Sequence, residues 1–222
     1  MGLVLLEPMF QTARSGTGPT KGALALRKVG IAFQMYATRY DGLLPVGGDR
    51  GMTDVVTSWQ TQLLPYLDRS DLYNRIDFSR PWDDPVNAEV FATKLPEFLI
   101  PDEPDAPPIG GHATTQQSAN SRLIRPDRQW RIDDIAQADG TTSTILIGEI
   151  GTALPPWGQP GNRRDPSTGI GVRPDQFGRS RHRFAYFAFV GGNVLTIDDT
   201  VSPRVMELLA DPENGSPSMD EF

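Results

Sequence analysis

The chain has 222 residues, and its net charge of -7 excludes a general electrostatic attraction to nucleic acid. It has no cysteine, which excludes disulfides, thiolate metal sites and cysteine nucleophiles, and its two histidines are too few for a histidine-rich metal site. The 22 glycines and 20 prolines favour a loop-rich fold with short strands over a helical bundle.

The N-terminal segment, residues 1–19, begins with the apolar run Leu3 to Leu6 and then becomes polar and glycine-rich. No run of about 18 apolar residues follows, so this chain is not expected to span a membrane. We predict a single domain over residues 20–210, preceded by the remnant of an apolar segment with a linker and followed by a flexible tail over 211–222.

A clear amphipathic helix is predicted from Thr20 onward. Its apolar residues recur every three or four positions, and Asp41-Gly42 supplies a stop signal. The expected inward face carries Leu26, Val29, Phe33, Tyr36 and Tyr40.

The stretch from Ser58 to Asn87 holds two of the four tryptophans, and we expect it to fix the fold. Ser58 is a suitable N-cap for a short helix that Pro65 should kink or end, and Ser70 is a suitable N-cap for a second one. Residues 47–57 before this stretch are expected to form a surface loop. The predicted structural anchors are Trp59, Pro65, Tyr66, Tyr73 and Trp82.

The sequence after residue 87 predicts short helices and strands separated by long loops. Residues 102–126 should be a loop with one weak strand, and 154–179 an irregular connection. Residues 129–136 fit a strand or a short helix equally well. The other predicted elements are a helical turn at 89–93, a strand at 141–150, a hairpin of 183–190 with 193–198 around Gly191-Gly192, and a helix at 203–210. This pattern predicts an α+β fold, with the N-terminal helix packed on an antiparallel sheet.

Few residues are candidates for chemistry. Glu149 ends a predicted strand and is the candidate acid or base for a hydrolase, but no second positioned group accompanies it, so a structural hydrogen-bonding role is favoured. Asp198 and Asp199 are weak candidates for a calcium site, with a simple turn as the favoured alternative.

The only basic cluster surrounds His182. If residues 179–183 were a strand, Arg179, Arg181 and Arg183 would share one side of it, as an anion site or as a solvated face paired with carboxylates. No nucleotide-binding, zinc-protease or nucleophile-elbow motif occurs, so no catalytic and no cofactor-binding residue is assigned.

The segment SWQTQLLPYLDRSDLYNRIDFSRPWD, residues 58–83, resembles a pattern of a bacterial family of unknown function, DUF1559. Weaker similarity extends to residues 23–32, 40–45, 95–101 and 141–150. Ile100 stands where the family usually has cysteine, and the C-terminal H-x9-D-G motif is degraded at Asp198-Asp199.

The resemblance implies a prepilin-type N-terminal signal, a pilin-like fold and a type II secretion pseudopilin-like protein of the cell envelope. Its expected partners are other pilin-like subunits or envelope components. Leu6 to Arg14 is similar to the tail of the family's apolar helix, which places the expected anchor upstream of Met1; a second register starting at Gly2 and Glu7 conflicts with Pro8. The alternative function is an exported module that binds a glycan or another small ligand through loops 102–126 and 154–179.

Overall fold

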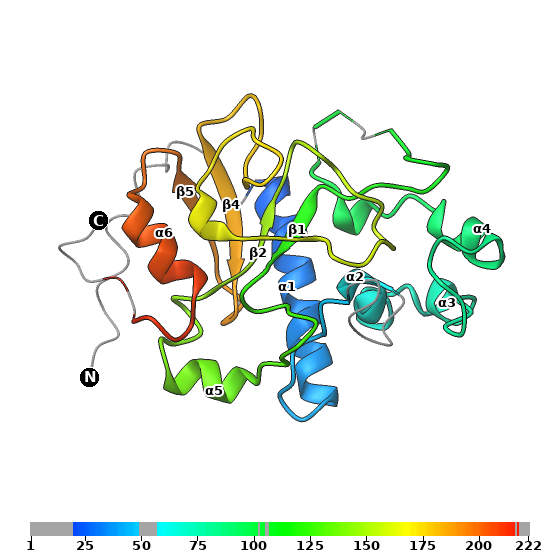
Figure 1. The fold of residues 1–222 in the computed structure, drawn as a ribbon, viewed down its shortest axis with the longest axis horizontal. Helices are drawn as coiled ribbons and strands as arrows, with labels where there is room; N and C mark the ends of the chain where they lie inside the picture. Colours follow the sequence, from blue (N-terminus) through cyan, green and yellow to red (C-terminus); the bar gives the residue numbers. More distant parts are fainter. Residues whose placement is uncertain (1–19, 49–56, 102, 105–106, 216, 218–222) are drawn as a thin grey trace.

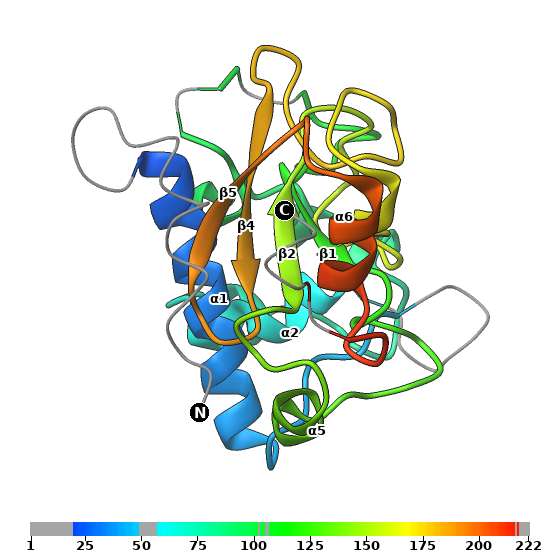
Figure 2. The same ribbon diagram turned by 90° about the vertical axis from the view of Figure 1, so that its left-hand side faces the viewer.

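The computed structural model describes residues 20–48, 57–101, 103–104, 107–215 and 217. These residues form one five-stranded sheet of order β3-β1-β2-β4-β5, in which every neighbouring pair is antiparallel except β1 with β3. Helices α1 (Lys21–Arg39) and α6 (Pro203–Ala210) lie on opposite faces of this sheet (Figures 1 and 2). The protein is therefore of the α+β class, as predicted. The strands are β1 (Gln117–Asn120), β2 (Ile145–Glu149), β3 (Arg163–Arg164), β4 (Phe184–Phe189) and β5 (Val194–Asp198).

Helix α1 (Lys21–Arg39) forms where the sequence places it. The Thr20 hydroxyl accepts a hydrogen bond from the Ala23 N–H and caps the first turn. Leu26, Val29 and Phe33 are buried against the sheet, whereas Tyr40 caps the C-terminal end and keeps 47% of its surface exposed. The expected inward face therefore ends one turn earlier than the sequence spacing suggested.

The stretch from Ser58 to Asn87 is mostly core, with two differences from expectation. Ser58 caps α2 (Trp59–Leu63), and Pro65 lies in the 3-10 turn η1 (Leu64–Tyr66) that ends the helix. Helix α3 starts with Ser70 as its first residue, while Arg69 occupies the cap without a side-chain hydrogen bond. Trp59 is buried, but Tyr66, Tyr73 and Trp82 are only partly covered. The remaining helical elements are α3 (Ser70–Tyr73), η2 (Pro85–Asn87), α4 (Ala88–Phe91), η3 (Pro96–Phe98), α5 (Ile132–Gln137), η4 (Pro166–Thr168) and α6 (Pro203–Ala210).

Alternation along β4 divides the apolar interior into two cores. Phe187 and Phe189 belong to the core under α6, whereas Ala188 and Val190 belong to the larger core under α1. The predicted β4–β5 hairpin is present, with Gly192 at φ 88° in the turn. Each face of the sheet thus has its own covering helix (Figure 2).

The largest departure from the sequence prediction is β1, which was expected as one weak strand within a loop. It is fully buried and lies between β2 and β3 in the sheet. Its four residues, Gln117 to Asn120, are mostly polar, so their pattern carried no apolar signal for a buried strand. The undecided segment 129–136 contributes helix α5.

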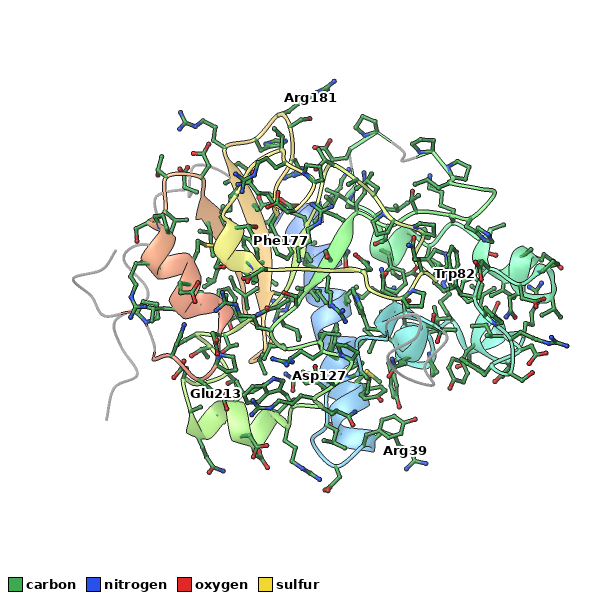
Figure 3. All side chains as sticks on the ribbon, in the orientation of Figure 1. Arg39, Trp82, Asp127, Phe177, Arg181 and Glu213 are labelled. Carbon is green, nitrogen blue, oxygen red and sulfur yellow. The ribbon has the colours of Figure 1, made fainter. Side chains whose placement is uncertain are left out.

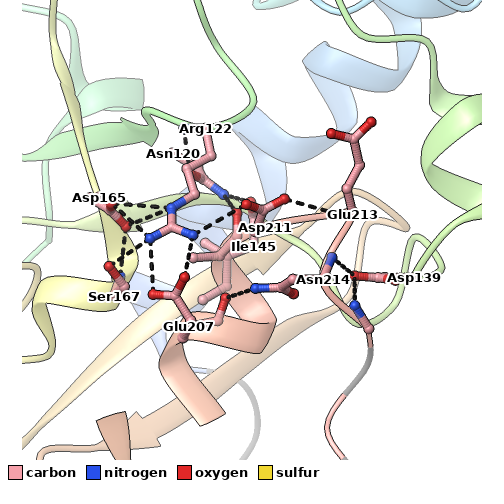
Figure 4. Close-up of polar contacts among 12 residues, drawn as sticks. Asn120, Arg122, Asp139, Ile145, Asp165, Ser167, Glu207, Asp211, Glu213 and Asn214 are labelled. Atoms are coloured by element: carbon pink, nitrogen blue, oxygen red, sulfur yellow. Dashed lines mark hydrogen bonds and ion pairs between the residues drawn. The ribbon is translucent and has the colours of Figure 1, made fainter. Parts of the chain in front are cut away.

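Several expectations concern segments at the limits of the described residues. The predicted remnant 1–19, most of the predicted loop 47–57 and the end of the predicted tail lie outside them. Gly47, at the start of that loop, is buried. At the start of the tail, Asn214 and Gly215 donate backbone hydrogen bonds to Asp139 (Figure 4). Within the described part of the chain, no helix is long and apolar enough to cross a membrane.

Candidate functional site

Glu149 lies at the end of β2 and is completely buried. Its Oε1 atom accepts hydrogen bonds from Arg179 Nε at 3.1 Å and from the Tyr186 N–H at 3.0 Å. Its Oε2 atom is buried and has no hydrogen-bond partner among the described residues. The structure therefore supplies the charged neighbour, Arg179, that the sequence left unidentified.

Arg179 links this carboxylate to a second acidic group nearer the surface. Its Nη1 atom is 3.0 Å from Glu103 Oε1, and His182 Nε2 is 3.5 Å from the same oxygen. Burial raises the pKa of Glu149 to about 7, although Arg179 and the Tyr186 N–H favour the charged form. A carboxyl group with a pKa near neutrality can exchange protons under ordinary conditions, but this one is covered on all sides.

The three arginines around His182 do not form a common stripe, because β4 begins only at Phe184. Arg179 points inward to Glu149, Arg181 extends from the surface (Figure 3), and Arg183 forms an ion pair with Asp199 at 3.1 Å. The prediction that these three arginines share one strand face is therefore wrong, whereas the predicted pairing with carboxylates is present for Arg179 and Arg183.

The acidic pair at the end of β5 is engaged within the protein. Asp198 Oδ1 accepts hydrogen bonds from the Thr200 hydroxyl at 2.7 Å and from its N–H at 2.9 Å, and these bonds lower the Asp198 pKa. Asp199 is paired with Arg183. Among the described residues, no group of three or more histidine, cysteine or acidic side chains is placed to hold a metal ion. The hydrogen bonds that Asp198 accepts from a residue two positions later are those of a turn.

A pocket of about 430 Å³ with a mixed polar and apolar lining lies at the β1–β3 edge of the sheet. The segment predicted as loop 154–179 supplies most of its lining, whereas Ser118 in β1 and Ser121 just after this strand are its lining residues from the segment predicted as loop 102–126. Its lining comprises Ser118, Ser121, Ala153, Pro155, residues 159–165, Thr168, Pro174 and Asp175.

Two buried polar side chains in this lining stand out. The Ser118 hydroxyl is buried and has no hydrogen-bond partner among the described residues. Arg164 is 8% exposed, and its guanidinium donates to the backbone carbonyls of Gln176, Thr152 and Ala153. Burial lowers the Arg164 pKa to about 10.

The Asp165 side of the pocket is held by a network centred on Arg122 (Figure 4). Arg122 Nη2 is 3.1 Å from Asp165 Oδ2, and Arg122 Nη1 is 2.7 Å from Glu207 Oε1 and 3.3 Å from Asp211 Oδ2. Hydrogen bonds from Glu207 and Asp165 raise the Arg122 pKa above its usual range. The network ties α6 to the chain segment that follows β3.

Sequence reasoning missed Ser118, Arg164 and Arg122 as site residues. The available signal was the run from Thr114 to Asn120, which is polar yet lacks glycine, proline and charge. Such a run is unusual for an exposed loop, where glycine, proline and aspartate are common. A search for uncharged polar segments would have singled it out.

The fold and the pocket define an α+β domain with a small cavity of mixed polar and apolar lining at one edge of its sheet. A family described as "Protein of unknown function (DUF1559)" matches residues 24–138, just over half of the chain. The chain belongs to this family. Searches of curated proteins and of solved structures gave no match. The family match covers α1 to α5 and β1, so the loop that supplies most of the pocket lies beyond it.

Proposed function

We propose that this chain is the globular part of a pilin-like or pseudopilin-like protein of the cell envelope, with a structural or assembly role in a filament or secretion-type system. On this proposal it is not an enzyme, it faces the periplasm or the exterior, and its partners are pilin-like subunits or envelope components. Membership of the DUF1559 family and the packing of α1 along the sheet support the proposal. A shared fold does not by itself define a function. The main support for the proposal is therefore a feature of the protein surface.

That feature is an apolar stripe on the outer side of α1, formed by Leu24, Ile31 and Met35. These residues occupy positions i, i+7 and i+11, which fall along one line of a helix. They remain 48%, 49% and 49% exposed, although the opposite side of the same helix is buried in the core. The stripe is flanked by the exposed Arg27 and Lys28, and an exposed apolar stripe with a polar border suits a second packing partner.

The proposal is tested with this chain and with a version extended upstream by about twenty apolar residues, enough to span a bilayer. We expect the chain itself to sediment as a monomer or weak oligomer, because residues 3–10 alone cannot bury the roughly 1,000 Å² that a stable interface needs. We expect the extended version to enter membranes and assemble.

The double variant Ile31→Glu, Met35→Glu should reduce assembly of the extended version at least tenfold while leaving its melting temperature unchanged. Val86→Glu is the matched control, since Val86 is 57% exposed and lies in η2, away from α1. Unchanged assembly of the double variant would contradict the role of the stripe. A tight oligomer that persists after deletion of residues 1–19 would place the interface on another part of the domain.

A second candidate function is an exported ligand-binding module, which one specific observation favours. The segment predicted as loop 154–179 supplies most of the pocket lining, and Ser118 in β1 with Ser121 just after it complete the wall from the sheet. A long loop that forms a cavity against a sheet edge is typical of recognition sites.

A further inference from the structure

The pocket at the β1–β3 edge supports an inference about the class of ligand, which rests on the second candidate function. We propose that it binds a neutral mono- or disaccharide, with the Ser118 hydroxyl as a hydrogen-bonding anchor. Its volume of about 430 Å³ lies in the lower part of the range of roughly 300–1,000 Å³ for small-molecule sites.

Ser118 carries the first part of the argument. A hydroxyl group can donate one hydrogen bond and accept two, and its burial without a partner destabilises the folded chain. Ser118 is completely buried, and its Oγ atom has no partner among the described residues. Because Ser118 belongs to the pocket lining, we assign a hydroxyl group of the ligand as the partner that its Oγ atom lacks.

The balance of charge selects a neutral ligand. The charged side chains of the lining are Arg163, Arg164, Asp165 and Asp175, two of each sign. These charges are already engaged within the protein: Arg163 and Arg164 donate to backbone carbonyls, and the carboxylates of Asp165 and Asp175 pair with Arg122 and Arg173. Their charges are thus compensated before a ligand binds, which favours a neutral ligand such as a sugar, whose hydroxyl groups both donate and accept hydrogen bonds.

The apolar part of the lining fits the same class. Pro155, Pro160 and Pro174 present C–H surface to the cavity, and sugar rings offer C–H faces between their hydroxyl groups. The site is also held in place before binding. The Arg164 guanidinium donates hydrogen bonds to the backbone carbonyls of residues 152, 153 and 176. The buried Asn162 side chain donates to Gln60 Oε1 at 2.8 Å and to the Gln117 carbonyl at 3.0 Å. A rigid site loses less conformational entropy when a ligand binds.

The test is a binding panel read by ligand-observed NMR and calorimetry on the intact chain. The neutral probes are glucose, N-acetylglucosamine and maltose, and the charged comparisons are glucuronic acid and glucosamine. We expect at least one neutral probe to bind more tightly than both charged ones. Ser118→Ala should weaken that binding about tenfold without lowering the melting temperature, because the hydroxyl makes no bond in the folded chain that would be lost.

Ser180→Ala is the matched control, since Ser180 is exposed and lies outside the pocket lining. Its affinity for the neutral probe should equal that of the unchanged protein. Binding of none of the neutral probes, preference for a charged one, or full affinity in Ser118→Ala would each overturn the proposal. The Ser118→Ala variant of the extended version should assemble normally, so failure here is distinct from failure of the assembly proposal.

Discussion

Replacement of Glu149 by glutamine tests whether a buried carboxyl group limits the stability of this fold above neutral pH. Glutamine keeps the size of the side chain and an oxygen that can accept from the Tyr186 N–H. It removes the ionisable group. The side chain is completely buried, so solvent screening has little influence on the result.

The sign of the effect follows from the direction of the pKa shift. The ordinary pKa of this carboxyl group is 4.5, and burial raises it to about 7 in the folded chain. Between these values the folded state binds more protons than the unfolded state. The stability that this group contributes is therefore complete below about pH 4.5 and is lost as the pH rises through about 7. At about 1.4 kcal/mol for each pH unit, the loss between pH 5 and pH 8 is roughly 2–3 kcal/mol.

The assay is urea unfolding followed by tryptophan fluorescence at pH 5 and pH 8. The free energy of unfolding of the Glu149→Gln variant should fall between these pH values by roughly 2–3 kcal/mol less than that of the unchanged protein. Asp127 does not disturb the comparison, because Arg125 lowers its pKa to about 2. Burial also raises the pKa of Asp139, but that group is present in both proteins and its effect cancels.

The groups around Glu149 require one control. Arg179 contacts the carboxylate directly, and His182 contacts Glu103, which accepts from Arg179. His182 is the ionisable side chain next to Glu103 that glutamine at position 149 leaves in place, so His182→Asn separates the two sources. An equal pH dependence in Glu149→Gln and the unchanged protein, with a reduced one in His182→Asn, would refute the assignment to Glu149.

Two further predictions concern stability. Trp59→Ala should lower the free energy of unfolding by roughly 3–5 kcal/mol, because Trp59 is 1% exposed. Trp82→Ala should lower it by only about 1–2 kcal/mol, because Trp82 is only partly buried. Equal losses for the two variants in urea titrations would contradict this difference. EDTA should lower the melting temperature by less than about 5 °C, or roughly 1–2 kcal/mol, because Asp198 and Asp199 are already bonded to Thr200 and Arg183. A larger decrease in calorimetry would restore them as metal ligands.

The sequence by itself determined the elements whose signals are local. Thr20, Ser58 and Ser202 each cap a helix by accepting a hydrogen bond from an N–H three residues later. The β4–β5 hairpin follows from two apolar strands joined at Gly191-Gly192. Each of these features depends on residues only a few positions apart, so the local sequence is sufficient to predict it.

The tertiary structure alone decided the partners of the polar residues. Glu149 could be singled out from its place at the end of a strand, but its contact with Arg179 joins residues thirty positions apart. Ser118 gave no apolar signal, and it becomes a pocket residue only because β1 is inserted between β2 and β3. Strand order and register are set by the packing of the whole sheet between α1 and α6. Periodicity shows which face a residue occupies and leaves open which distant side chain it meets there.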